Sequence, residues 1–183
     1  MALQLFLATI PVIIILLYVY NKDKNKEPLE LLIKLFLSGF LACSLVLIAS
    51  EVLNFLPFMD RSKNEINIIE TFLYAFIGVA LVEEVSKWIM VMLLGYNSNE
   101  YDEIYDILIY SIFVSLGFAF IENIIYVTTT QSIKTAIIRA LSAVPSHACD
   151  AIFMGYFLSI AKQHSVNKNK KGCRTLHITL KFP

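Results

Sequence analysis

Glu83, Glu84 and Lys87 form a cluster of charges in the middle of the apolar segment 68–95, where Glu70 is the only other charged residue. A charged side chain at bilayer depth costs about 2.5 to 3.5 kcal/mol on insertion scales. Three such groups are therefore expected to pair, to face a hydrated cavity or to take part in chemistry. Because a buried carboxylate is a good general base toward water near neutral pH, the cluster indicates a polar, chemically active site within a membrane.

Two later apolar segments each contribute a group that suits such a site. Glu122 lies in the segment 104–127 beside Asn123, and His147 lies in the segment that follows. Histidine and asparagine side chains can donate hydrogen bonds to a developing oxyanion, which is usually the largest catalytic contribution. A carboxylate that activates water and donors that stabilise an oxyanion are sufficient for peptide hydrolysis without a covalent intermediate.

The surroundings of His147 favour a functional role over simple packing. Pro145, two residues before His147, lacks a backbone N–H and is expected to kink the helix there. Asp150 follows three residues later, close enough along a helix to orient the imidazole.

Other interpretations of these residues remain open. Glu83 and Lys87 have the favourable order for a helical ion pair, so a purely structural pair would explain two of the three charges but not Glu84. His147 and a glutamate could bind zinc, although the H-E-x-x-H signature is absent from the sequence. A proton-coupled carrier also uses buried glutamate, histidine and lysine, but it more often shows paired repeats with broken helices.

The elements that must position these groups are predicted to be membrane spans. The chain is 57% hydrophobic and 16% charged, with zero formal net charge and a mean hydropathy of +0.67, so neither nucleic acid nor an acidic partner is indicated. About 20 apolar residues cross a bilayer, and this predicts an all-α, polytopic transmembrane helix bundle of about five spans, at residues 2–20, 29–56, 68–95, 104–127 and 134–161. We expect one integral-membrane domain over residues 1–163 and a short basic polar tail over 164–183.

The distribution of basic residues predicts the orientation of the bundle. Lysines of the first loop (22–26) and the basic residues after the fifth span would lie on the same side of the membrane. The positive-inside rule then places the N-terminus outside and the tail in the cytoplasm.

Three ordered motifs resemble one known family. Glu83-Glu84-x-x-Lys87, Phe118-x-x-x-Glu122-Asn123 and the later His147 are similar to the motifs of the PrsW family of intramembrane glutamic-type proteases, which are distant relatives of the CAAX prenyl proteases. The resemblance covers roughly residues 18–156. Members of the family usually continue with a further span after the histidine segment, where this sequence has the basic stretch 164–183.

The resemblance implies an endopeptidase of the bacterial cytoplasmic membrane. We expect it to need neither a metal ion nor another cofactor, because the H-E-x-x-H signature is missing and the charged cluster is rich in carboxylates but has only one histidine within a span. It would make the first (site-1) cut in a membrane-anchored anti-sigma factor, which starts the release of a stress-response sigma factor. The implied catalytic residues are Glu83, Glu84, Glu122 and His147, with Glu83 favoured as the base. The implied supporting residues are Lys87, Asn123 and Phe118, of which Lys87 would fix the protonation of the glutamate pair and Asn123 would bind or polarise the scissile carbonyl. Asp150 is added as a supporting residue from its spacing to His147, and it is not a position expected to be fixed in the family. A non-proteolytic membrane immunity or scaffold protein is the alternative.

Overall fold

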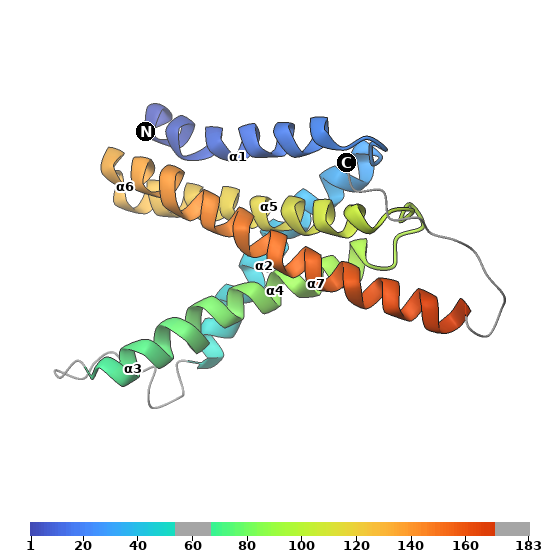
Figure 1. The fold of residues 1–183 in the computed structure, drawn as a ribbon. Helices are drawn as coiled ribbons and strands as arrows, with labels where there is room; N and C mark the ends of the chain where they lie inside the picture. The colour runs from blue at the N-terminus through green and yellow to red at the C-terminus, as the bar shows by residue number, and fades with distance from the viewer. Residues whose placement is uncertain (54–66, 171–183) are drawn as a thin grey trace.

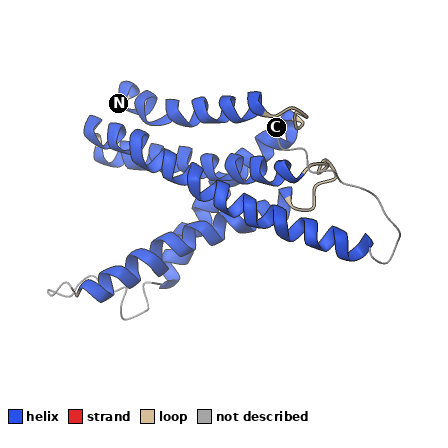
Figure 2. Cartoon of the chain, viewed as in Figure 1, coloured by secondary structure: helices blue, strands red, loops and turns tan. Residues whose placement is uncertain are grey.

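The computed structural model describes residues 1–53 and 67–170, with the backbone alone described for 166–170, and this part of the chain is helical apart from short loops (Figures 1 and 2). The α-helices are α1 (Ala2–Lys22), α2 (Leu29–Leu53), α3 (Ile68–Leu73), α4 (Val82–Met90), α5 (Ile104–Thr130), α6 (Ile133–Ile138) and α7 (Val144–Lys170). Three π-helical segments continue these helices. Segment η1 (Tyr74–Leu81) joins α3 to α4, and η2 (Val91–Gly95) extends α4. Segment η3 (Arg139–Ala143) joins α6 to α7. The described residues thus form five helical rods at the five predicted places, which confirms the all-α membrane bundle.

The rods differ in how readily they qualify as membrane spans. Within the described residues, α1, α2 and α5 are long and apolar enough to cross a bilayer. The two remaining rods, 68–95 and 133–170, contain the π-helical segments and most of the charged candidate site residues. The end of the predicted second span, residues 54–56, lies outside the described residues. Helix α7 continues past residue 163, the predicted domain boundary, and the division into domain and tail stays a prediction.

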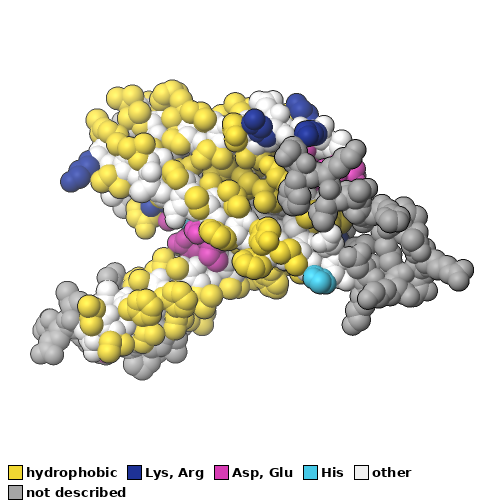
Figure 3. Space-filling model, in the orientation of Figure 1, with side chains coloured by type: hydrophobic (Ala, Val, Ile, Leu, Met, Phe, Trp, Pro, Cys, Tyr) yellow, Lys and Arg dark blue, Asp and Glu magenta, His cyan; other side chains and the backbone are white. Residues whose placement is uncertain are grey.

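Helix α5 is the centre of the bundle. Of its most apolar stretch, 72% is buried, compared with 17% for α1. Helices α1, α2 and α7 pack around α5, and the α3–α4 rod leaves the rest of the bundle as an arm (Figure 1). Figure 3 shows apolar side chains spread over the surface of α1 and of this arm. Such exposed apolar surface is what a bilayer covers.

Two glycines allow α2 and α5 to approach each other closely. A Cβ atom on Gly117 would lie 1.9 Å from the backbone oxygen of Phe36, and one on Gly39 would lie 2.3 Å from the backbone oxygen of Val114. Small residues at helix contacts are a general feature of membrane bundles, since they let backbones come together. This contact places α5, with Glu122, against α2.

Replacing Gly117 by alanine is expected to destabilise the fold by about 1–3 kcal/mol or more, because the new methyl group meets backbone atoms that cannot rotate away. Thermal unfolding of detergent-solubilised protein measures the effect. Thr128→Ala, an exposed position on the same helix, should leave the midpoint unchanged. Equal midpoints for Gly117→Ala and wild type would contradict the close contact of α2 and α5.

A buried polar cluster ties the loop between α1 and α2 to α5. Glu27 is only 4% exposed, and the Tyr110 hydroxyl donates a hydrogen bond of 2.8 Å to its Oε2 atom. The Glu27 backbone N–H donates to Asp23. Asp106, 1% exposed, accepts from the backbone N–H groups of Asp102 and Glu103 at the start of α5. Burial, together with the neighbouring carboxylates of Asp106 and Asp23, raises the pKa of Glu27 to about 7.

This raised pKa gives the stability of the protein a defined pH dependence. Between the ordinary carboxyl value of 4.5 and about 7, the folded state holds a proton at Glu27 that the unfolded state releases. The free energy of unfolding is therefore expected to decrease as the pH rises through this window. Unfolding midpoints at about pH 5 and about pH 8 test this expectation, and Glu27→Gln should flatten the difference. A difference of the same size in Glu27→Gln would assign the dependence to other groups.

Candidate active site

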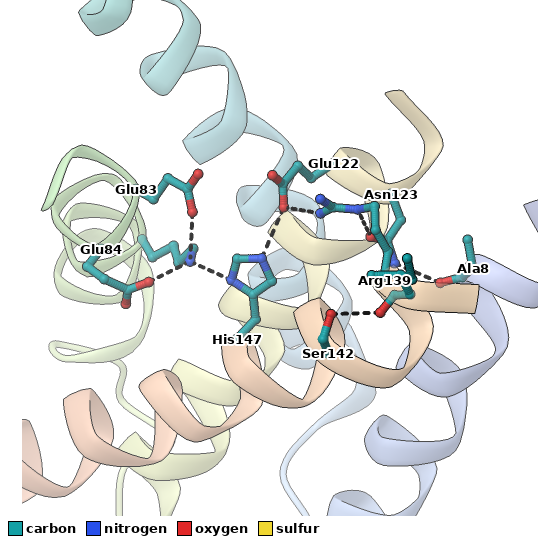
Figure 4. Close-up of polar contacts among 10 residues, drawn as sticks. Ala8, Glu83, Glu84, Glu122, Asn123, Arg139, Ser142 and His147 are labelled. Carbon is teal, nitrogen blue, oxygen red and sulfur yellow. Dashed lines mark hydrogen bonds and ion pairs between the residues drawn. The ribbon is translucent and has the colours of Figure 1, made fainter. Parts of the chain in front are cut away.

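Lys87 lies at the centre of the cluster that the sequence predicted. Its side chain is completely buried, and its Nζ atom lies 2.6 Å from Glu84 Oε1, 3.9 Å from Glu83 Oε2 and 2.9 Å from His147 Nδ1. Figure 4 shows these groups converging from α4 and α7. The helical pair of Glu83 and Lys87 considered above is therefore the longer of the two glutamate contacts, and of the two glutamates it is Glu84 that is hydrogen-bonded to Lys87.

His147 connects the lysine to a third carboxylate. Its Nε2 atom lies 3.0 Å from Glu122 Oε2. Because an ammonium group has no acceptor, Nδ1 must accept the hydrogen bond from Lys87 and Nε2 must carry the proton directed at Glu122. The geometry thus selects one neutral tautomer of the imidazole. Both nitrogens have partners, so Asp150, which is exposed, does not orient the ring as the spacing had suggested.

Arg139 supports Glu122 from the far side. Its Nη2 atom donates to Glu122 Oε2 and its Nε atom to Asn123 Oδ1, both at 2.6 Å. The Asn123 amide nitrogen donates in turn to the backbone oxygen of Ala8 in α1 at 2.7 Å. Asn123 is fully buried and both ends of its amide are engaged. The structure therefore gives it a supporting contact between helices in place of the expected contact with a scissile carbonyl.

Phe118 forms an apolar wall of the site. Its ring, 1% exposed, meets the His147 ring edge-on with centroids 5.6 Å apart. The Lys87 ammonium lies 4.4 Å from the centre of the same ring. A cation over an aromatic face is stabilised electrostatically, so Phe118 contributes both to the placement of His147 and to the burial of Lys87.

The carboxylates keep a route to the surface. Side-chain exposure is 33% for Glu84, 16% for Glu83 and 15% for Glu122. Acidic side chains appear at the hollow where the α3–α4 arm meets the rest of the molecule (Figure 3). A cavity of about 390 Å³ adjoins the site, lined by Glu84, Val85, Trp88, Asp150, Phe153 and Met154. Of the charged residues in contact with Lys87, Glu84 is the one that lines this cavity.

Two groups of side chains among the described residues have the composition of a metal site. Glu84, His147 and Asp150 offer ligand atoms within 4.8 Å of one another, as do Glu27, Asp102 and Asp106. The first group shares Glu84 and His147 with the cluster around Lys87. The Glu84 carboxylate and the His147 imidazole are therefore already in contact with an ammonium group.

Arg139 was not among the residues that the sequence predicted for the site. The structure places it in direct contact with Glu122. A signal was available: Arg139 is a charged residue within the predicted fifth span, and intramembrane charges generally have a functional or pairing role. What the sequence could not supply was its partner on another helix.

Comparison with known proteins gives consistent matches. The profile of a family described as "PrsW family intramembrane metalloprotease" matches residues 27–181. A protein named Protease PrsW from Oceanobacillus iheyensis is 39% identical over 87% of this chain and 70% of its own length. Proteins of the same name from Geobacillus kaustophilus and Clostridioides difficile are 37% and 36% identical, over 83% and 93% of this chain and 64% and 71% of theirs. No solved structure matches the chain.

Proposed function

Since this chain belongs to the PrsW family of intramembrane proteases, we propose that it hydrolyses a peptide bond of a membrane-anchored protein with water activated by the Glu83/Glu84 pair. The chain is a multi-pass protein of the bacterial cytoplasmic membrane. The observation that carries the proposal is the convergence of three carboxylates, one lysine and one histidine from three rods of the bundle on one partly accessible site.

The contacts around Lys87 favour Glu83 as the group that takes the proton from water. Glu84 accepts a short hydrogen bond from the ammonium, which stabilises it as a carboxylate. Glu83 lies 3.9 Å from the same ammonium and is less constrained by it. Glu83 thus acts as the general base, and Glu84 holds Lys87 in place at the edge of the cavity.

His147 is the more accessible donor next to the glutamate pair, since Lys87 is completely buried whereas the His147 side chain is 11% exposed. Its one N–H group, on Nε2, points at Glu122, so a developing oxyanion would have to share or replace that contact. The contacts with Lys87 and Glu122 fix the position of the imidazole before the substrate arrives.

The family description names a metalloprotease, which raises the question of whether the side chains at this site could bind a metal ion. Catalytic zinc takes about three protein ligands, and Glu84, His147 and Asp150 offer suitable atoms. The Lys87 ammonium, however, lies within hydrogen-bonding distance of both Glu84 and His147, and a divalent cation would face its positive charge at that place. The arrangement does not fit a metal ion, and we propose a metal-independent, glutamic-type reaction.

Active, purified protein is accordingly expected to contain far less than one zinc ion per chain and to keep its cleavage rate in the presence of a chelator. Elemental analysis and a chelator titration measure both properties on the same preparation. Stoichiometric zinc, together with chelator-sensitive cleavage that added zinc restores, would establish a metalloprotease and overturn this part of the proposal.

The substrate class rests on the family resemblance, which implies a membrane-anchored anti-sigma factor that receives its first cut here. Co-expression of the chain with such candidate substrates tests the activity and the substrate together. Wild type is expected to produce a shortened product that is absent with His147→Gln, while Glu30→Gln, an exposed glutamate paired with Lys34 on α2, serves as a control. A product of the same amount with His147→Gln would favour the scaffold alternative.

A further inference from the structure

Arg139 has a position that the proposed reaction does not yet use. It lies in the π-helical segment η3, eight residues before His147. Its guanidinium reaches across to α5 and contacts Glu122 and Asn123, both at 2.6 Å. The Tyr126 ring, also on α5, lies 4.1 Å from the guanidinium carbon. Figure 4 shows this group on the side of Glu122 away from the Glu83/Glu84 pair.

The two contacts of Glu122 meet on a single oxygen. Oε2 accepts from Arg139 Nη2 at 2.6 Å and from His147 Nε2 at 3.0 Å. An arginine guanidinium only donates hydrogen bonds, so an ionised Glu122 satisfies it best. An acceptor at this place requires the proton of the imidazole to be on Nε2, and this leaves Nδ1 to accept from Lys87.

The charges of the cluster also depend on Arg139. Three carboxylates (Glu83, Glu84 and Glu122) share the site with two basic groups, Lys87 and Arg139. Arg139 forms a shorter contact with Glu122 than His147 does. Without it, Glu122 would be a poorly compensated charge among buried groups, which is costly in a medium of low polarity.

We propose that Arg139 is a positioning residue of the proteolytic centre: its guanidinium holds Glu122 as an ionised acceptor and thereby sets the tautomer and orientation of His147. This inference rests on the proposed function of the same site. The planar guanidinium matters as well as the charge, because it reaches Glu122 and Asn123 together from one rigid fork.

Arg139→Gln is expected to lower kcat for cleavage by on the order of 10²-fold with little change in KM, because the arginine acts on the placement of a catalytic group and not on substrate binding. Arg139→Lys keeps the charge but not the fork, and its kcat should lie between those of Arg139→Gln and wild type. Lys134→Gln, an exposed cation on the preceding helix α6, is the matched control and should cleave like wild type.

The double variant Glu122→Gln/Arg139→Gln separates positioning from a general effect on folding. If Arg139 acts through Glu122, the double variant should be no slower than Glu122→Gln alone, and it contains no uncompensated carboxylate at this place. Losses that multiply in the double variant would overturn the proposal, as would a wild-type kcat for Arg139→Gln. Should Arg139→Gln fail to fold, the test is the comparison of kcat between Arg139→Lys and wild type. Equal kcat values would contradict a positioning role for the planar guanidinium.

Failure of this inference differs from failure of the proposed function. Wild-type cleavage by Arg139→Gln, with loss of cleavage in Glu122→Gln, removes only the role of the arginine. Cleavage at the wild-type rate by variants of the glutamate pair removes the catalytic centre itself.

Discussion

Glu83→Gln and Glu84→Gln are each expected to lower the rate of peptide cleavage by about 10²–10⁴-fold, the typical contribution of a general base. Glutamine keeps the size and much of the hydrogen bonding of glutamate but cannot accept the proton from water. The Glu83 variant should lose the base itself. The Glu84 variant should lose the negative charge that pairs with Lys87, whose Nζ atom lies 2.6 Å from Glu84 Oε1.

Single-turnover cleavage of a membrane-anchored substrate by purified variants measures this loss directly. Glu51→Gln, an exposed glutamate near the end of α2, is the control for the loss of one carboxylate elsewhere in the chain. Wild-type rates for both variants of the pair would eliminate the carboxylate mechanism and leave the scaffold function as the better explanation.

Replacing Lys87 by methionine is expected to remove cleavage and to destabilise the protein by about 3–5 kcal/mol, the usual cost of breaking a buried ion pair from one side. Methionine is similar in size, so the loss isolates the charge. Glu84 would lose its ammonium partner and His147 Nδ1 would lose its donor, since Lys87 serves both. Thermal unfolding in detergent and the cleavage assay record the two effects.

The double variant Glu84→Gln/Lys87→Met distinguishes stability from catalysis. It removes the carboxylate that the single variant leaves unpaired, so much of the lost stability should return while cleavage stays absent. A stable Lys87→Met variant with full activity would show that the buried ammonium has no part in the site.

The architecture was largely predictable because hydrophobicity determines it so strongly. Apolar runs of about 20 residues have few alternatives to helices in a bilayer, and the observed rods begin at Ala2, Leu29, Ile68, Ile104 and Ile133, within one residue of the predicted starts. The π-helical segments were not predicted. They depend on how a helix packs against its neighbours, and the chain has no local signal for them apart from Pro145, which follows η3.

The sequence predicted which residues form the site better than it predicted which of them are in contact. Charged groups that are costly against lipid converge, and this brought Glu83, Glu84, Glu122 and His147 to one place. Which groups are in contact depends on side-chain directions. Lys87 hydrogen-bonds Glu84, three residues earlier in the chain, and lies farther from Glu83, four residues earlier. Their catalytic roles remain predictions for the variants to test.

Asn123 and Arg139 show where sequence reasoning reaches its limit. Asn123 was expected to face the substrate because amides can polarise a carbonyl. It faces Ala8, 115 residues earlier in the chain, and Arg139, 16 residues later. Neither contact could be predicted from the spacing of the sequence motifs, because each depends on which faces of α1, α5 and the η3 segment come together.

The π-helical segment η3, residues 139–143, makes the site sensitive to chain length as well as to side-chain identity. A π-helical turn accommodates an additional residue relative to an α-helical one. Deleting one residue of η3 would allow a regular α-helix to form, and because the deletion removes the additional residue, Arg139 and His147 would stay on about the same face of the rod. Adding one residue to this stretch would instead rotate one of the two by about 100° relative to the other, so that Glu122 could no longer contact both. A one-residue insertion within 140–143 should therefore lower cleavage far more than a one-residue deletion there, whereas single insertions near the exposed start of α6 should be tolerated.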